Sequence, residues 1–352
     1  MQQITIFLGQ PNKKEQSMFP NNINFAIQNE QGLFDALRPY SLQICCGLHL
    51  YKCSSFDNKD ALHNVIKEIN KIKQWANLNI NTIKYNEKKY INHFFSNFKE
   101  NPKYVKHLFN KFKMPCIIVS AGASLDKNIN LLKQKKSLII TTPPVLNKLN
   151  KINIRVDFVV FISPHKPNKE HFKNITKYPP LIFDSGCNQD VISNYKGEKY
   201  ISLDSKPVSN YINNILDIGN VLCGMCVSHY AYNLAVKMGC EPIIFVGQDL
   251  SFTNNKSHAT CTALNENKEG DIVIDGYFGG KVKTDMLMKS YLDIFESMMR
   301  ESKTKTYNCT EGGVNIKGME NKSLKEVLLK LEEVNVISFL KELQLIKDDS
   351  LR

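Results

Sequence analysis

The stretch PCIIVSAGASLDKN, residues 115–128, holds the pattern that decides the fold. Its apolar run at 116–120 is followed at once by a glycine-containing loop and then by a polar segment suited to begin a helix. Continuous apolar runs, rather than alternating ones, are typical of parallel strands covered on both faces. We therefore predict a buried strand that ends in a loop and a helix.

Further runs of the same kind follow at helix-length intervals, at 137–141, 156–162, 181–184, 199–203 and 243–247. They predict an α/β fold with a Rossmann-like, mainly parallel sheet and helices on both faces. Helical spacing of apolar residues predicts helices at 225–238 and 285–299, with an irregular segment before the second.

The chain divides into three predicted parts: a mixed and helical N-terminal region at 1–113, the Rossmann-like domain at 114–320, and C-terminal helices at 321–352. In the first part, apolar residues at helical spacing run through 62–75 and 90–98, and the stripe continues past Asn101-Pro102 to Phe112. These aromatic and aliphatic residues are expected to form core.

The composition is that of a globular protein, with 42% hydrophobic residues among 352. No apolar run approaches the roughly 20 residues that span a bilayer, and the first residues lack the basic flank of a signal peptide. We therefore expect a cytoplasmic protein whose cysteines are reduced thiols. The cysteines are Cys45, Cys46, Cys53, Cys116, Cys187, Cys223, Cys226, Cys240, Cys261 and Cys309.

The net charge of +12 raises the question of a nucleic-acid partner. Arginine supplies most bidentate contacts to bases, yet nearly all of the 46 basic residues are lysines. The arginines are Arg38, Arg155, Arg300 and Arg352. We expect no nucleic-acid partner, and only a general attraction for phosphorylated ligands.

Ligands of open α/β sheets bind beyond the carboxyl ends of the strands, and the loop at 120–128 is the first such place. Gly122 allows close approach of the backbone, Ser120 and Ser124 offer hydroxyls, and Ser124 or Asp126 can cap the next helix. Free amides at that helix start could hold a phosphate. A tight turn with a helix cap explains the pattern equally well, since neither a G-x-G-x-x-G nor a P-loop signature is present.

A second loop, at 217–231, carries Gly224 before the predicted helix and could likewise present amides to an anion. Cys223 and Cys226 form a C-x-x-C pair, but no second pair supplies the four ligands of a zinc site. His229 on this helix is expected to pack rather than to catalyse.

The stretch VGQDLSFTNNKSHA, residues 246–259, ends another strand with polar side chains. Asp249 and Gln248 can bind ribose hydroxyls or a catalytic partner, and His258 can take a proton from an acceptor hydroxyl near neutral pH. The alternative is that Asp249 caps a turn and His258 is an exposed loop residue. Weaker candidates are Asp184, at the end of the strand at 181–184, and Ser163 with the nearby His165.

Four segments occur in the same order in motility accessory factor proteins, which share a domain with archaeal 6-hydroxymethylpterin pyrophosphokinases. They are PCIIVSAGASLDKN (115–128), VDFVVFISP (156–164), GCEPIIFVGQDLSFTNNKSHA (239–259) and YNCTEGGVNIKG (307–318). The chain resembles this family over about residues 85–330. Proteins of the family look like glycosyltransferases that attach pseudaminic or legionaminic acid to flagellin Ser/Thr, with a domain similar to that of bacterial sialyltransferases that use CMP-activated donors.

The resemblance implies that the domain at 114–320 binds a nucleotide sugar at its strand-end loops. Two departures are Ala123, where the family usually has proline, and Ser163, where many members have aspartate. The donor-binding residues expected by motif are Ser120, Gly122, Ala123, Ser124, Asn128, Ser163, Asp184, Gly224, Gly247, Gln248, Thr310 and Gly312.

The implied activity is transfer of a nonulosonic acid from a CMP donor to a protein Ser/Thr such as flagellin, or to a glycan hydroxyl. We expect His258 to act as general base and Asp249 to position donor or base. No D-x-D triplet occurs, so we expect no metal and no cofactor apart from the CMP-sugar substrate.

Two alternatives remain at this point. One is ATP-dependent pyrophosphoryl transfer to a hydroxymethylpterin, which would need Mg²⁺ held by carboxylates such as Asp249, Asp184 and Asp275. The other is a non-catalytic nucleotide-binding protein of the motility machinery.

Overall fold

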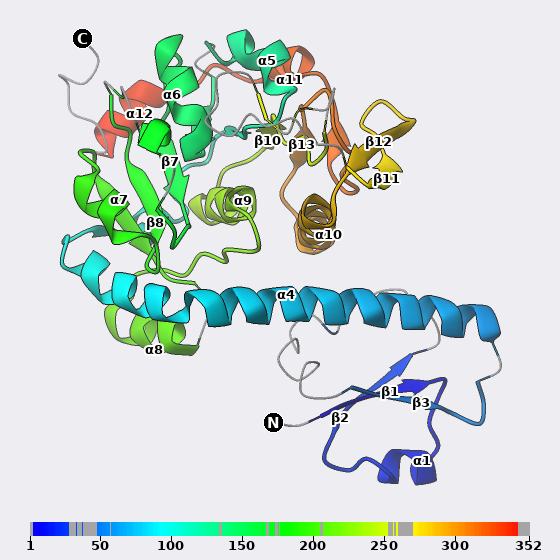
Figure 1. Ribbon diagram of the computed structural model, residues 1–352. Coiled ribbons are helices and arrows are strands. Elements are labelled where there is room, and N and C mark those ends of the chain that lie inside the picture. Colours follow the sequence, from blue (N-terminus) through cyan, green and yellow to red (C-terminus); the bar gives the residue numbers. More distant parts are fainter. Residues whose placement is uncertain are drawn as a thin grey trace. The chain divides into compact units, whose positions relative to one another are not determined.

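The computed structural model describes residues 3–27, 33, 37, 48–56, 58–133, 136–166, 169–172, 175, 177–204, 207–252, 256, 258–259 and 270–343 (Figure 1). Cys45, Cys46, Cys261, Arg38 and Arg352 lie outside these residues. The chain forms two compact units, residues 1–88 and 89–352. The three-part division at 113 and 320 stays a prediction.

The first unit contains a small parallel sheet with strand order β2-β1-β3. Its strands are β1 (Ile4–Leu8), β2 (Ile23–Ile27) and β3 (Leu48–Lys52), and the short helix α1 (Lys13–Ser17) follows β1. The short apolar stretch near the start of the sequence is the fully buried strand β1. It packs with Val65, Ile69 and Ile72 of helix α4 (Lys59–Phe98), which begins in this unit.

The second unit is built on a nine-stranded sheet of order β14-β13-β10-β5-β6-β7-β8-β9-β4, in which every neighbouring pair is parallel. The predicted α/β fold with a parallel sheet is confirmed, and each of the six predicted runs contains a strand. The strands are β4 (Lys103–Tyr104), β5 (Cys116–Val119), β6 (Leu138–Thr141), β7 (Phe158–Phe161), β8 (Leu181–Asp184), β9 (Lys199–Ser202), β10 (Ile243–Val246), β13 (Thr306–Asn308) and β14 (Glu320–Asn321).

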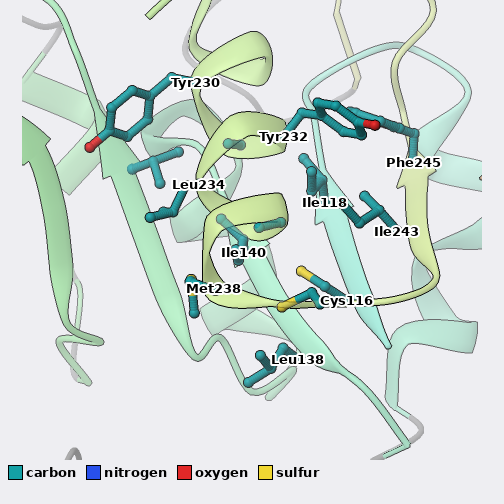
Figure 2. Packing of buried hydrophobic residues seen from close by; sticks show 14 of the residues in the cluster. Cys116, Ile118, Leu138, Ile140, Tyr230, Tyr232, Leu234, Met238, Ile243 and Phe245 are labelled. Atoms are coloured by element: carbon teal, nitrogen blue, oxygen red, sulfur yellow. The ribbon is translucent and has the colours of Figure 1, made fainter. Parts of the chain in front are cut away.

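Helices lie against both faces of this sheet, because alternate residues of each strand point to opposite sides. On one face, Ile118 of β5 and Phe245 of β10 pack with Tyr232 and Leu234 of α9 (Figure 2). On the other, Val119 and Val246 pack with Leu125 of α5 and Val145 of α6. The helices are η2 (Val105–Leu108), α5 (Leu125–Asn128), η3 (Ile129–Lys133), α6 (Pro143–Lys151), η4 (Lys169–Phe172), α7 (Gln189–Asn194), α8 (Pro207–Leu216), α9 (Val227–Met238), α10 (Met286–Glu301), α11 (Leu324–Lys330) and α12 (Val336–Glu342). Among the described helices, none combines the length and the apolar content that crossing a bilayer requires.

Two expectations about local structure were wrong. The helical stripe does not continue past Pro102, because the chain enters the edge strand β4 and the short helix η2, whose Lys106 N–H donates to the carbonyl of Ile218 at 2.9 Å. The segment expected to be irregular before α10 contains an antiparallel hairpin, β11 (Ile272–Asp275) and β12 (Lys281–Thr284). Its strands, IVID and KVKT, alternate between exposed and less exposed residues, and β12 has a single apolar residue.

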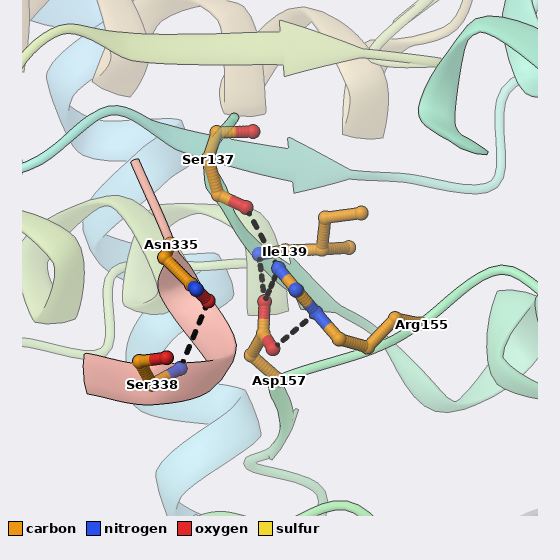
Figure 3. Close-up of polar contacts among 6 residues, drawn as sticks. All are labelled: Ser137, Ile139, Arg155, Asp157, Asn335 and Ser338. Atoms are coloured by element: carbon orange, nitrogen blue, oxygen red, sulfur yellow. Dashed lines mark hydrogen bonds and ion pairs between the residues drawn. The ribbon is translucent and has the colours of Figure 1, made fainter. Parts of the chain in front are cut away.

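An ion pair between the buried Asp157 carboxylate and the half-buried Arg155 side chain joins the starts of β6 and β7 (Figure 3). The Arg155 guanidinium lies 2.7 Å from the Asp157 carboxylate and also donates to the Ser137 carbonyl at 3.1 Å. The same carboxylate accepts the Ile139 N–H at 2.7 Å. A buried charge requires such partners, because desolvation without them is costly.

We expect Asp157→Ala to lower the free energy of unfolding by about 3–5 kcal/mol, because it leaves the Arg155 charge without its carboxylate. Urea denaturation at neutral pH measures the loss. The control is Asp275→Ala, which breaks the ion pair to Lys281 at two exposed side chains and should cost less than about 1 kcal/mol. Equal losses in both variants would contradict the role assigned to the buried pair.

Candidate functional site

Strands β5 and β10 mark the topological switch point of the large sheet. From β5 the sheet extends through β6, β7, β8 and β9 to one side, and β10 pairs with the other edge of β5. Ligands of open α/β sheets bind outside the carboxyl ends of the strands at such a point. The loops that follow β5 and β10 therefore form the candidate site.

A buried carboxylate joins these two loops. Asp249, only 2% exposed, accepts hydrogen bonds from the Ser124 backbone N–H at 2.9 Å and from its hydroxyl at 2.5 Å. The N–H of Gly122 donates to the Gly247 carbonyl at 2.7 Å. A Cβ atom on Gly122 would lie 2.1 Å from the Asp249 carboxylate, so this approach requires glycine. The predicted residues Gly122, Ser124, Gly247 and Asp249 thus lie together. The Asp249 carboxylate is hydrogen-bonded to Ser124.

The hydroxyl of Ser120 connects the start of α9 to the same loops. It donates to Oε1 of Gln248 at 2.7 Å and lies 2.9 Å from the Ser228 hydroxyl. Since its single proton is used toward Gln248, Ser228 is the donor in the second contact. Ala123 is half-buried beside these residues.

The loop at 310–313, which follows β13, closes against β10. The Thr310 hydroxyl accepts the Gln248 N–H at 3.1 Å, and the Val314 N–H donates to the Asp249 carbonyl at 2.9 Å. Gly313 has a φ of 71°, and a Cβ atom there would come within 2.2 Å of the Asp249 carbonyl oxygen. Glycine is required here by both backbone conformation and space.

Asn128 of α5 binds the same loop. Its amide donates to Oε1 of Glu311 at 3.1 Å and lies 3.5 Å from the Cys309 carbonyl. A Cβ atom on Gly312 would lie 3.0 Å from that of Ser124. We call the loops at 120–128, 247–249 and 310–313 the switch-point cluster. Within it, Glu311 was not predicted individually, because its role depends on a contact 183 residues away in the sequence.

His229 caps the start of α9 and is fully buried. Its Nδ1 accepts the N–H groups of Met225 and Cys226, both at 3.2 Å, and its Nε2 donates to the Tyr291 carbonyl at 3.0 Å. The prediction that His229 packs within the protein is confirmed by these contacts. Gly224 has a φ of 62°, and a Cβ atom there would lie 2.7 Å from that of His229.

We expected certain backbone amides to hold a phosphate. Most of them instead donate hydrogen bonds to other groups of the protein. The Ser124 amide donates to Asp249, and the Met225 and Cys226 amides donate to His229. Burial also raises the pKa of the Cys226 thiol to about 12, so it stays protonated. The expectation of open anion-binding amides at these positions was wrong, because buried side chains occupy them.

Ser163 and Asp184 form a separate cluster. The Asp184 carboxylate, 3% exposed, accepts the Gly186 N–H at 3.0 Å, and the Ser163 carbonyl accepts the Asn188 N–H at 2.9 Å. Asp184 ends β8, three strands from β5 and so about 14 Å from the first loop at ordinary strand spacing. The tertiary structure therefore does not bring these two residues to the switch-point cluster.

His258 lies beside the loop that follows β5. The N–H of Ala259 donates to the Ala121 carbonyl at 2.8 Å, and the Ala259 side chain is fully buried. This contact holds the half-buried His258 next to the loop after β5. Residues 253–255 and 257, which connect it to β10, lie outside the described residues.

His171 of η4 is a candidate that the sequence pattern did not reveal. It is 8% exposed, and its Nε2 has no hydrogen-bond partner among the residues that the structure describes. Burial, and next the charge of His258, lower the pKa of His171. Its segment, KEHF, has neither a strand-end position nor a motif, so only the tertiary structure places it near His258.

Known proteins share the sequence pattern and the fold of this chain. Residues 92–255 match the family model described as 6-hydroxymethylpterin diphosphokinase MptE-like. The structure is similar to that of the Maf glycosyltransferase from Magnetospirillum magneticum AMB-1, with a TM-score of 0.62 and 15% sequence identity. The predicted resemblance to these proteins is confirmed.

The structural match covers 94% of this chain and 53% of the Magnetospirillum chain, so this chain spans about half the length of that protein. At this identity the likeness concerns the fold. A comparison with curated protein sequences found no match.

A double-mutant cycle tests the link between the two switch-point loops. We expect Ser124→Ala and Asp249→Ala to couple by about 1–3 kcal/mol in the free energy of unfolding, because the two side chains share a buried hydrogen bond. Urea denaturation of the two single variants and the double variant measures it.

The control cycle combines Ser124→Ala with Asp184→Ala, whose effects should add within about 0.5 kcal/mol at their larger separation. Additive effects in the first cycle would show that the link does not stabilise the loops.

Proposed function

We propose that this chain is a glycosyltransferase that transfers a nonulosonic acid from a CMP-activated donor to a Ser or Thr hydroxyl of a protein such as flagellin, or to a glycan hydroxyl. The observation that carries the proposal is the joining of three strand-end loops at the switch point of the sheet. The fold shared with a Maf glycosyltransferase supports it.

The donor would bind over the switch-point cluster, where Ser120, Gln248 and Thr310 supply polar groups at the strand ends. Because several helix-start amides are already used, the phosphate charge requires other groups. Lys127 is exposed at this cluster, with its ammonium 3.4 Å from the Glu311 carbonyl. An ammonium there would stabilise the departing phosphate by electrostatics.

The reaction forms a bond between the acceptor oxygen and the anomeric carbon and breaks the bond between that carbon and the phosphate oxygen of CMP. CMP leaves with the electron pair, and the acceptor proton passes to His258 as general base. Asp249 acts by position: its carboxylate holds Ser124 and thereby the first loop.

Pyrophosphoryl transfer from ATP to a pterin is the second candidate, favoured by the family model that matches residues 92–255. That reaction requires carboxylates that converge on Mg²⁺. Asp249 is bound to Ser124, Asp184 ends a strand four positions away from β10, and Asp275 is paired with Lys281. Within the described part of the chain no group of three or more acidic, histidine or cysteine side chains could hold a metal ion, so these residues do not fit.

Thermal unfolding with nucleotides separates these functions. CMP at about 100 times its dissociation constant should stabilise the protein by about 2.7 kcal/mol, which raises Tm by about 5–10 °C. ATP with Mg²⁺ at the same concentration should have a smaller effect. Stabilisation by ATP and Mg²⁺ alone would contradict the proposal, and CMP binding without any transfer from CMP-pseudaminic or CMP-legionaminic acid would indicate a non-catalytic nucleotide-binding protein.

We expect His258→Ala to lower kcat for transfer from CMP-pseudaminic acid by about 10²–10⁴-fold, the usual contribution of a general base. Release of CMP and mass spectrometry of a Ser/Thr acceptor peptide measure it. The control is His107→Ala, on η2 at the edge of the sheet, which should keep wild-type kcat. Full transfer activity in both His258→Ala and Asp249→Ala would refute the site.

A further inference from the structure

We propose that His171 is a positioning residue for His258: its buried Nε2 accepts a hydrogen bond from the ring N–H of His258 when His258 receives the acceptor proton. The inference rests on the proposed function, in which His258 is the general base. It assigns a role to a side chain outside the switch-point cluster.

The placement of His258 follows from its neighbour. Ala259 donates to the Ala121 carbonyl and belongs to the apolar cluster that contains Leu125 of α5 and Val145 of α6. His258 is therefore held beside the loop after β5.

The placement of His171 follows from its helix. η4 packs against α6, and α6 begins directly after β6, the strand next to β5. His258 thus adjoins the loop after β5, and η4 packs on the helix that follows the neighbouring strand β6. The two histidines interact electrostatically, although they are 87 positions apart (258 − 171) in the sequence. Of the charged side chains on α6, Lys148 is bound to Asp126 and Lys151 is exposed.

The Nε2 atom of His171, which has no hydrogen-bond partner among the described residues, points to a function. Leaving a buried polar atom without a partner is unfavourable in a folded protein, and such atoms are rare. Burial and the neighbouring charge keep the pKa of His171 below its ordinary value, so the ring is neutral near pH 7. A neutral imidazole has one nitrogen that accepts a hydrogen bond, and that nitrogen can receive an N–H donor.

This arrangement orients the base. When a ring N–H of His258 is bonded to His171, the other nitrogen of His258 keeps its lone pair for the acceptor hydroxyl, as a third group orients the base in other enzymes. The proton moves from the acceptor oxygen to His258 and stays there while CMP leaves. His171 gains no proton, and it stabilises the imidazolium by accepting a hydrogen bond.

Histidine titration by NMR tests the pair without any assay of activity. The chain has 8 histidines, so signals can be assigned by their loss in single variants. We expect His171→Phe to lower the pKa of His258 by about one unit, the equivalent of a tenfold effect. In His258→Ala, which removes a half-buried side chain, the pKa of His171 should rise because a neighbouring cation is lost.

Steady-state kinetics test whether His171 positions His258. We expect His171→Phe to lower kcat for release of CMP from CMP-pseudaminic acid about tenfold with KM unchanged, and to move the acidic limb of the pH profile with the pKa of His258. His171→Gln, which keeps an acceptor oxygen, should restore most of the rate. The thermal stabilisation by CMP should be the same in both variants.

The outcomes separate the inference from the proposed function. Unchanged titration of His258 in His171→Phe, or of His171 in His258→Ala, would overturn the pairing even if the enzyme transfers sugar. Loss of activity in both His171→Phe and His171→Gln with an unshifted pH profile would show a structural role instead. Coupled titration in a protein that neither binds CMP nor transfers sugar would refute the proposed function and leave the pair intact.

Discussion

The hydrogen bonds between the Asp249 carboxylate and Ser124 hold together the two loops of the switch point. A carboxylate that is 2% exposed is stable only with such donors, because burial of an unpaired charge is costly. Asp249 in turn imposes glycine at 122, where a Cβ atom would collide with its carboxylate, and at 313, where a Cβ atom would collide with its backbone. The geometry of the first two strand-end loops therefore depends on this carboxylate, and the loop at 310–313 packs on the backbone of the same residue.

Three histidines near the carboxyl edge of the sheet differ because their surroundings differ. His229 uses both ring nitrogens within the protein and stabilises the start of α9. His258 is half-buried beside the loop after β5, and His171 is buried with an Nε2 that no described residue bonds. Residue type alone predicts none of these distinctions, since protonation and bonding follow from burial and partners.

Much of the fold was predictable, because strands buried on both faces carry continuous apolar runs such as 116–120 and 243–247. The hairpin β11–β12 was not, because the KVKT sequence of β12 has only one apolar residue and therefore gives little strand signal. The site was predictable in part. Four of the predicted residues follow strand ends and converge: Gly122, Ser124, Gly247 and Asp249. Asp184 ends a strand too, but its strand β8 lies three strands from β5 in the sheet. The order of strands in a sheet is set by strand pairing, which the local sequence does not show.

The sequence by itself determined that residues 115–128 make a strand, a glycine loop and a helix start, because apolar continuity, glycine and helix-capping residues are local signals. It also determined that Asp249 stands at a strand end. Only the tertiary structure decided that β10 pairs with β5, that the Asp249 carboxylate binds Ser124, and that His171 lies near His258. These are contacts between residues far apart in the chain, and they depend on how strands pair and helices pack rather than on any local pattern.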